Sequence, residues 1–150
     1  SYCSKNDYAT AITYYLEAIK LDSQHDPALY NLGYAYHRTG QLSMAIESYK
    51  LALKLNPSSA ECHFNLASAF SDNNMPDSAV LEYKLSLKYD EDNVDCCFHI
   101  AEIQEKLGNL ADAYTYFKKA CLLDTSSSKA KQGRDRLKKI MDEKNIKYVE

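Results

Sequence analysis

The residues best suited to chemistry in this chain are its histidines and cysteines. Cys96, Cys97 and His99 are close in sequence, and Cys62 or His63 could join them around a metal ion. The Cys-x2–4-Cys pairs of structural zinc sites are absent, however, and adjacent cysteines on a helix point in different directions. We therefore expect reduced cysteines that behave as small apolar side chains, and no bound metal.

Enzymatic motifs are also missing. The chain has no glycine-rich phosphate loop, no Gly-x-Ser-x-Gly elbow and no His-Glu-x-x-His motif. Each histidine could act as a base, but the sequence places no nucleophile or orienting acid beside any of them. The four histidines are His25, His37, His63 and His99. We expect a protein that is not an enzyme, with no catalytic residues and no cofactor.

The elements that position these residues follow a repeat of 34 residues. Four alanines recur at this interval, each followed four residues later by an aromatic residue. The pairs are Ala11 with Tyr15, Ala45 with Tyr49, Ala79 with Tyr83, and Ala113 with Phe117. Two further slots hold small residues: Ala18, Ala52, Ser86 and Ala120 in one, and Gly33, Ala67 and Ala101 in the other. Small residues at fixed spacing allow two helices to pack closely.

Another slot of the repeat separates its two apolar patterns. It is occupied by Asn6, Gly40, Asn74 and Gly108. Because only Gly and Asn adopt the left-handed conformation at low cost, each of these residues is expected to close a helix. Pro76 should lie at the start of a helix, and Asp26 should cap a helix whose first turn contains Pro27.

Apolar periodicity and these end signals predict pairs of helices. They span about 27–39 with 42–55, 60–73 with 76–89, and 94–107 with 110–123, after an unpaired helix at about 8–21. The residues expected to face the core are Leu32, Tyr36, Leu66, Phe70 and Ile100 on first helices, and Ile12, Ile46, Leu53, Val80 and Leu87 on second helices. The expected fold class is all-α, built from antiparallel helix pairs.

The segment Leu29-Tyr30-Asn31-Leu32-Gly33-Tyr34-Ala35-Tyr36, with Ala45, Tyr49 and Pro57 after it, resembles the tetratricopeptide repeat (TPR). Leu29 stands where Trp is usual in that family. The resemblance covers roughly residues 1–126 and implies a right-handed superhelical solenoid. Complete repeats are expected at 26–59, 60–93 and 94–127, after a partial repeat at 1–25 that is mainly its second helix. Because that repeat lacks most of its first helix, we expect the chain to be a fragment of a longer protein.

Residues 128–150 are expected to form a C-terminal capping helix and tail. Thr125-Ser126-Ser127-Ser128 offers capping hydroxyls, and the apolar stripe is Ala130, Leu137, Ile140 and Met141. Eight basic and four acidic residues give this region a net charge of +4, so the preceding residues carry −7 of the total of −3. Only Tyr148 could stack on bases, so we expect a solvated cap or a contact with an acidic partner and no nucleic acid.

The resemblance to tetratricopeptide proteins implies that first helices line a concave groove for a peptide. Asn31 and Asn65 occupy equivalent positions, as in the asparagine ladder of the TPR arm of O-linked N-acetylglucosamine transferases, which these repeats resemble. A carboxamide can bond both the C=O and the N–H of a peptide, whereas His99 at the third position cannot copy this pairing. The expected groove residues are Tyr30, Asn31, Tyr34, His37, Arg38, Glu61, Phe64, Asn65, Ser68, Asp72, Asp95, Phe98, His99, Glu102 and Lys106.

Two interpretations stay open for these groove positions. The aromatic residues Tyr30, Phe64 and Phe98 could contact the peptide or pack between helices. The groove positions of the second and third repeats hold Glu61, Asp72, Asp95, Glu102 and Glu105 against Lys106, a net charge of −4. This excess favours a neutral or basic ligand, unless the acids are a solvated face. Replacing Asn31 or Asn65 by alanine should weaken binding and leave stability nearly unchanged.

Chaperone adaptors of the family hold a C-terminal carboxylate with lysines, an arginine and asparagines. The matching positions here lack two of these cations, so acidic heat-shock chaperone tails are disfavoured. The main functional hypothesis is a scaffold or adaptor module that binds a peptide segment of a partner protein. The alternatives are a substrate-recruiting arm of a larger, glycosyltransferase-like enzyme, or a repeat that self-associates through its incomplete N-terminal end. No membrane segment or secretion signal is found, and we expect a cytoplasmic protein.

Overall fold

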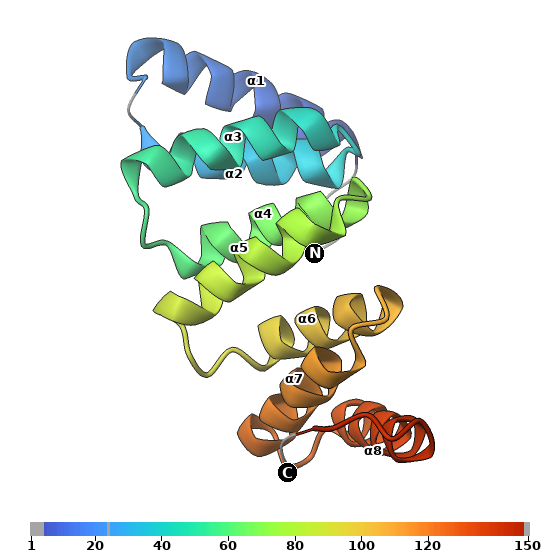
Figure 1. Cartoon of the computed structure of the whole chain (residues 1–150). Helices are drawn as coiled ribbons and strands as arrows, with labels where there is room; N and C mark the ends of the chain where they lie inside the picture. The colour runs from blue at the N-terminus through green and yellow to red at the C-terminus, as the bar shows by residue number, and fades with distance from the viewer. Residues whose placement is uncertain (1–4, 24, 149–150) are drawn as a thin grey trace. The chain divides into compact units, whose positions relative to one another are not determined.

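The computed structural model describes residues 5–23 and 25–148, and within them it contains helices and no strand. The helices are α1 (Lys5–Leu21), α2 (Asp26–Arg38), α3 (Leu42–Leu55), α4 (Ala60–Asp72), α5 (Pro76–Tyr89), α6 (Val94–Lys106), α7 (Leu110–Leu123) and α8 (Ser128–Glu143). The all-α fold of helix pairs is confirmed (Figure 1). The six paired helices begin and end within one residue of their predicted bounds.

Left-handed residues close three of the first helices, as predicted. Gly40, Asn74 and Gly108 have φ of 80°, 58° and 81°. After α2, the Gly40 N–H donates to His37 O and the Gln41 N–H to Tyr36 O, which satisfies two carbonyls of the last turn. The prediction for Asn6 is wrong, because this residue lies inside α1.

Helix starts also follow the sequence, with one exception. Pro76 is the first residue of α5, as predicted. The side chain of Ser127 caps α8 by accepting a hydrogen bond from the Ala130 N–H at 3.3 Å. The predicted cap Asp26 is wrong: it is the first helical residue of α2, and the ring Nδ1 of His25 accepts from the Ala28 N–H at 3.0 Å. A histidine cap is hard to predict because Ser, Thr, Asp and Asn dominate that position.

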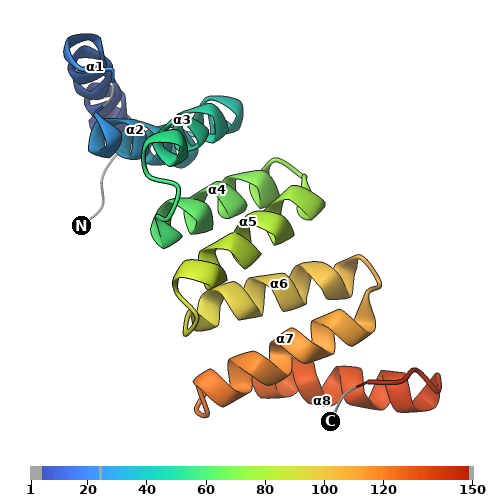
Figure 2. The same ribbon diagram turned by 60° about the vertical axis from the view of Figure 1, so that its left-hand side comes forward.

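The chain divides into two compact units, an N-terminal unit up to Tyr89 and a C-terminal unit from Asp90. In the N-terminal unit, each helix from α1 to α5 packs on the next (Figure 2). The recurring small residues lie at these crossings, since Ala45 and Ala79 are fully buried. A Cβ added to Gly33 would lie 2.8 Å from Cδ1 of the buried Tyr49, so a larger residue would clash with that ring.

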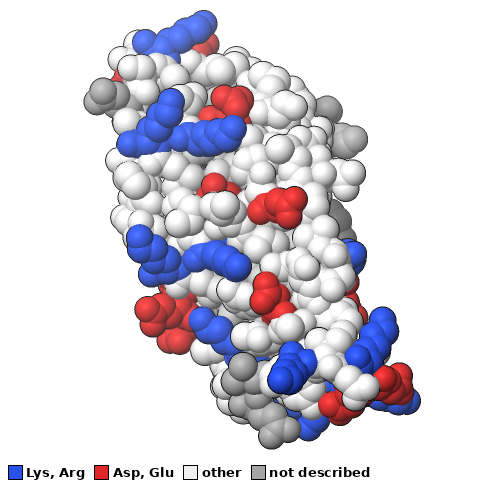
Figure 3. Space-filling model, in the orientation of Figure 1, with Lys and Arg blue, Asp and Glu red and all other residues white. Residues whose placement is uncertain are grey.

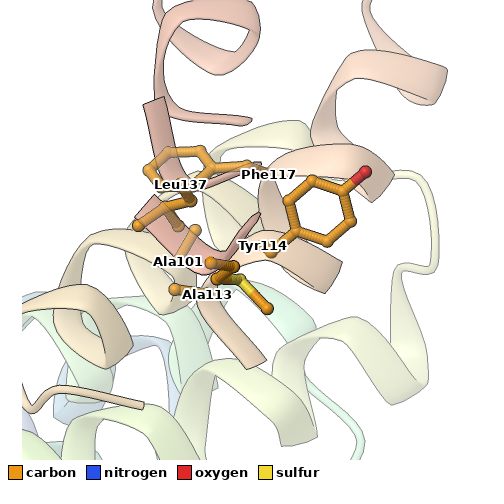
Figure 4. Packing of buried hydrophobic residues seen from close by; sticks show 6 residues of the cluster. Ala101, Ala113, Tyr114, Phe117 and Leu137 are labelled. Carbon is orange, nitrogen blue, oxygen red and sulfur yellow. The ribbon is translucent and has the colours of Figure 1, made fainter. Parts of the chain in front are cut away.

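The C-terminal unit has its own apolar core between α6, α7 and α8. Its buried members are Ala101, Ala113, Tyr114, Phe117, Leu137 and Met141 (Figure 4). Of the predicted α8 stripe, Ala130, Leu137 and Met141 are fully buried and Ile140 is partly buried. A Cβ on Gly133 of α8 would lie 2.6 Å from Cε1 of Phe117, so α7 and α8 are in close contact.

Candidate functional site

A polar hollow lies between α2 and α4 of the N-terminal unit. Its volume is about 300 Å³. The lining residues are Tyr34, His37 and Arg38 on α2, and Asn65, Ser68 and Asp72 on α4. All six belong to the predicted groove set, and the structure brings them together because α2 and α4 are the first helices of successive repeats. The hollow therefore presents hydrogen-bond donors and acceptors to a ligand, including the cation of Arg38 and the carboxylate of Asp72.

A hydrogen-bonded contact crosses this hollow from α2 to α4. His37 Nε2 lies 2.6 Å from Asp72 Oδ2. The side chain of His37 is 14% exposed and that of Asp72 is 59% exposed, so the contact is open to solvent on the carboxylate side. The sequence places both residues in the groove set but does not reveal that they pair.

A second polar network joins the start of the same two helices. The Tyr30 hydroxyl donates to Glu61 Oε1 at 2.8 Å, and Asn65 Nδ2 donates to the Tyr30 hydroxyl at 2.7 Å. Burial, together with the hydrogen bond to the Glu61 carboxylate, raises the pKa of Tyr30 well above its usual value. The phenol therefore stays protonated and donates to Glu61, which ties α2 to α4.

Asn31 differs from Asn65. Asn31 is half-buried on α2, and no hydrogen bond to its side chain is found among residues 5–23 and 25–148. Its carboxamide is therefore available as both donor and acceptor, whereas the Asn65 amide nitrogen already bonds Tyr30.

The aromatic residues next to the predicted ladder face the second helix of their own repeat. The ring centroid of Tyr30 is 5.9 Å from that of Tyr49, and Phe64 is 5.4 Å from Tyr83. Phe98 lies 5.7 Å from Phe117 at a steep interplanar angle, which is a favourable aromatic geometry. These contacts agree with the interpretation that the rings pack between helices.

The predicted groove residues of the third repeat lie on α6, in the C-terminal unit. Asp95 and Lys106 are exposed, while His99 and Glu102 are half-buried, with His99 Nδ1 3.7 Å from Glu102 Oε2. Glu105, counted as a groove acid in the sequence, receives two hydrogen bonds from the Arg136 guanidinium of α8, at 3.0 and 2.7 Å. The arginine neutralises this carboxylate, so the predicted charge of −4 is too negative.

The surroundings of the buried cysteines and of His63 favour a structural role over metal binding or catalysis. Cys62, Cys96, Cys97 and Cys121 are buried free thiols, and Cys3 lies outside the described residues. Burial raises the pKa of Cys62 to about 12, so its thiol is protonated and a poor metal ligand or nucleophile. His63 Nδ1 lies 2.7 Å from Glu82 Oε2 and its Nε2 lies 2.9 Å from Pro57 O. Within the described part of the chain, no three potential metal ligands come together.

None of the described helices combines the length and apolar character that crossing a lipid bilayer requires.

Family models for tetratricopeptide repeats match almost the whole repeat region. A model described as TPR repeat matches residues 1–40, and models described as tetratricopeptide repeat match 27–59, 60–93 and 94–127. A comparison with curated protein sequences finds no match.

Solved structures share this fold. A crystal structure of MamA is 22% identical, has a TM-score of 0.85, and covers 97% of this chain and 88% of its own. The Arabidopsis OM64 TPR domain is 25% identical with a TM-score of 0.69, covering 76% of this chain and 94% of its own. The first TPR of Spaghetti (RPAP3), bound to the HSP90 peptide SRMEEVD, is 18% identical with a TM-score of 0.71. The match covers 81% of this chain and 96% of that one.

Proposed function

Because the chain belongs to the tetratricopeptide repeat family, we propose that it is a non-catalytic scaffold or adaptor module that binds a peptide segment of a partner protein. The proposed binding surface is the hollow between α2 and α4 together with the neighbouring carboxamide of Asn31. The observation that carries this proposal is the convergence of six polar side chains from two successive first helices on one open hollow.

The chemistry of this surface suits an extended peptide backbone. Asn31 can accept from a backbone N–H and donate to a backbone C=O at the same time. Ser68 adds a hydroxyl and Arg38 adds an exposed cation, and both line the hollow. Because hydrogen bonds to the peptide backbone do not depend on the peptide's side chains, the charged residues around the hollow must determine which peptide sequences bind.

Those charged residues favour a neutral or basic ligand. In the N-terminal unit, Asp72 is 59% exposed although it pairs with His37, and Glu61 is exposed beside Tyr30. An acidic peptide such as the one bound to RPAP3 would place its carboxylates near these two acids, so we expect this chain to bind it poorly.

The test begins with selection of peptides from a random phage-displayed library on the whole chain. The affinity of a labelled selected peptide is then measured by fluorescence anisotropy for the wild type and for Asn31→Ala. Loss of one or two backbone hydrogen bonds should raise Kd by about 2- to 10-fold. The matched control is Gln132→Ala, which removes an exposed carboxamide on α8 and should leave Kd unchanged.

Two outcomes would contradict the proposal. If Asn31→Ala and a Ser68→Ala/Arg38→Ala variant both bind with the wild-type affinity, the ligand does not occupy the α2–α4 hollow. If the selected peptides are predominantly acidic, the assignment of a neutral or basic ligand is wrong.

A further inference from the structure

A second hollow, distinct from the α2–α4 surface, lies between α7 and α8 of the C-terminal unit. Its volume is about 470 Å³. It is lined by Tyr114, Lys118, Cys121, Leu122 and Thr125 on the α7 side and by Lys131, Arg134, Asp135 and Lys138 on α8. The lining of the hollow therefore combines apolar side chains with four basic side chains and a single carboxylate.

The lining of this hollow includes one largely exposed apolar residue. Leu122 is 72% exposed at the last turn of α7, beside the buried side chains of Tyr114 and Cys121. The close contact of Gly133 with Phe117 holds α7 and α8 together beneath it. An apolar side chain of a ligand could cover Leu122 and remove it from water.

The basic residues of the hollow differ in whether they already form an ion pair within the protein. Arg134 is held by its neighbour Asp135, with Nε and Nη2 each 2.8 Å from Oδ1. Arg136, elsewhere on α8, is paired with Glu105. Lys118, Lys131 and Lys138 make no ion pair within the part of the chain that the structure describes. The nearby carboxylate of Asp124 accepts hydrogen bonds from the Ser126 hydroxyl and N–H, at 2.6 and 2.9 Å, and interacts with Lys131 only at longer range.

We propose that the α7–α8 hollow binds an acidic peptide segment of a partner protein, with an apolar side chain on Leu122 and carboxylates on Lys118, Lys131 and Lys138. Charge complementarity selects this occupant, because three lysines without an ion-pair partner among the described residues line the same hollow as an exposed leucine. This surface is separate from the proposed α2–α4 peptide surface and favours the opposite charge.

Single-stranded nucleic acid fits this hollow less well. Proteins that bind single strands present aromatic faces on which bases stack. The aromatic residue that lines this hollow is Tyr114, which is only 5% exposed and whose ring lies 4.8 Å from that of Tyr148. The exposed apolar group is aliphatic, which suits a peptide side chain and offers no stacking platform.

The experiment uses the whole chain and a labelled synthetic peptide that alternates glutamate with leucine, followed by anisotropy. The test variant is Lys118→Gln/Lys131→Gln/Lys138→Gln. The matched control is Lys129→Gln/Lys139→Gln/Lys144→Gln, which removes the same charge from exposed positions outside the hollow. The test variant should weaken binding at least about tenfold and the control less than about threefold. Circular dichroism checks that both variants are folded.

Three further measurements distinguish binding in the hollow from general charge attraction and from nucleic-acid binding. Leu122→Ala should weaken binding of the glutamate–leucine peptide several-fold. A peptide with glutamine in place of glutamate should bind neither the wild type nor the triple-lysine variant. Equal weakening by the two lysine variants would overturn the proposal, because attraction would then come from net charge alone. Tighter binding of labelled oligouridylate than of the acidic peptide, dependent on the same three lysines, would overturn it as well.

Discussion

Asn31 and Asn65 occupy equivalent positions one repeat apart, yet their amide groups have different surroundings. Asn65 donates to the Tyr30 hydroxyl at 2.7 Å, and that hydroxyl donates to Glu61. The sequence alone predicts that both asparagines contribute little to stability. The structure changes this expectation for Asn65, because its amide links α4 to α2.

We therefore predict that Asn65→Ala lowers the free energy of unfolding by about 0.5–1.5 kcal/mol, the usual net value of one hydrogen bond. Asn31→Ala should leave it within about 0.5 kcal/mol of the wild type. Urea denaturation followed by circular dichroism measures both. In a double-mutant cycle, Tyr30→Phe should make Asn65→Ala nearly neutral. Additive losses would mean that the Asn65–Tyr30 bond contributes nothing to stability.

The residues of the α2–α4 hollow could be predicted from the sequence, but their pairings could not. The 34-residue period places His37 and Asp72 on the same face of successive first helices. Whether Asp72 meets His37 or Arg38 depends on side-chain rotamers and on the distance between the helices, which a repeat pattern does not contain. The partner of Glu105 could not be predicted from the repeat pattern either, since Arg136 lies on a helix outside the repeat.

At the scale of helices, the recurring alanines determine how closely the two helices of a repeat can pack. Ala45, Ala79 and Ala113 are each fully buried, whereas the equivalent Ala11 on α1 is only partly buried. The bounds of the six paired helices could be predicted within one residue because Gly, Asn and Pro mark many of them, whereas α1 begins three residues before its predicted start at about residue 8. Asn6 is the exception, because α1 runs through the position at which the other repeats have a turn.

We predict that Ala79→Leu destabilises the protein by about 1–3 kcal/mol, because the added side chain must displace packed neighbours. The matched control is Ala111→Leu, at an exposed position on α7, which should change stability by less than about 0.5 kcal/mol. Thermal and urea denaturation of both variants provide the comparison. A parent-like stability for Ala79→Leu would show that the α4–α5 crossing is looser than the structure indicates.

At the scale of the whole molecule, charge is distributed unevenly along the chain. Residues 1–126 carry a net charge of −7 and residues 127–150 carry +4. On the face in Figure 3, basic and acidic side chains lie close together around α8. Two arginines of α8 are paired, Arg134 with Asp135 and Arg136 with Glu105. The basic excess that remains unpaired includes the three lysines of the α7–α8 hollow. The two proposed surfaces thus favour peptides of different charge.

Burial is also uneven along the chain, and this predicts a gradient of local stability. Each repeat is stabilised mainly by its neighbours, so an element with few buried side chains should open at low cost. No side chain of α1 from Asp7 to Leu21 is fully buried, whereas α7 buries Ala113, Tyr114, Phe117, Ala120 and Cys121. Tyr14 and Leu21 on α1 are largely exposed.

We predict that backbone amides of α1 exchange with deuterium at least about tenfold faster than those of α7, because a difference of about 1.4 kcal/mol in opening free energy gives that factor. Hydrogen exchange with mass spectrometry on the whole chain resolves the two helices. Peptides from α4, which buries Leu66 and Phe70, serve as an internal reference and should be protected like α7. Equal protection of α1 and α7 would contradict the prediction, since α1 would then be stabilised by contacts beyond those its described side chains make.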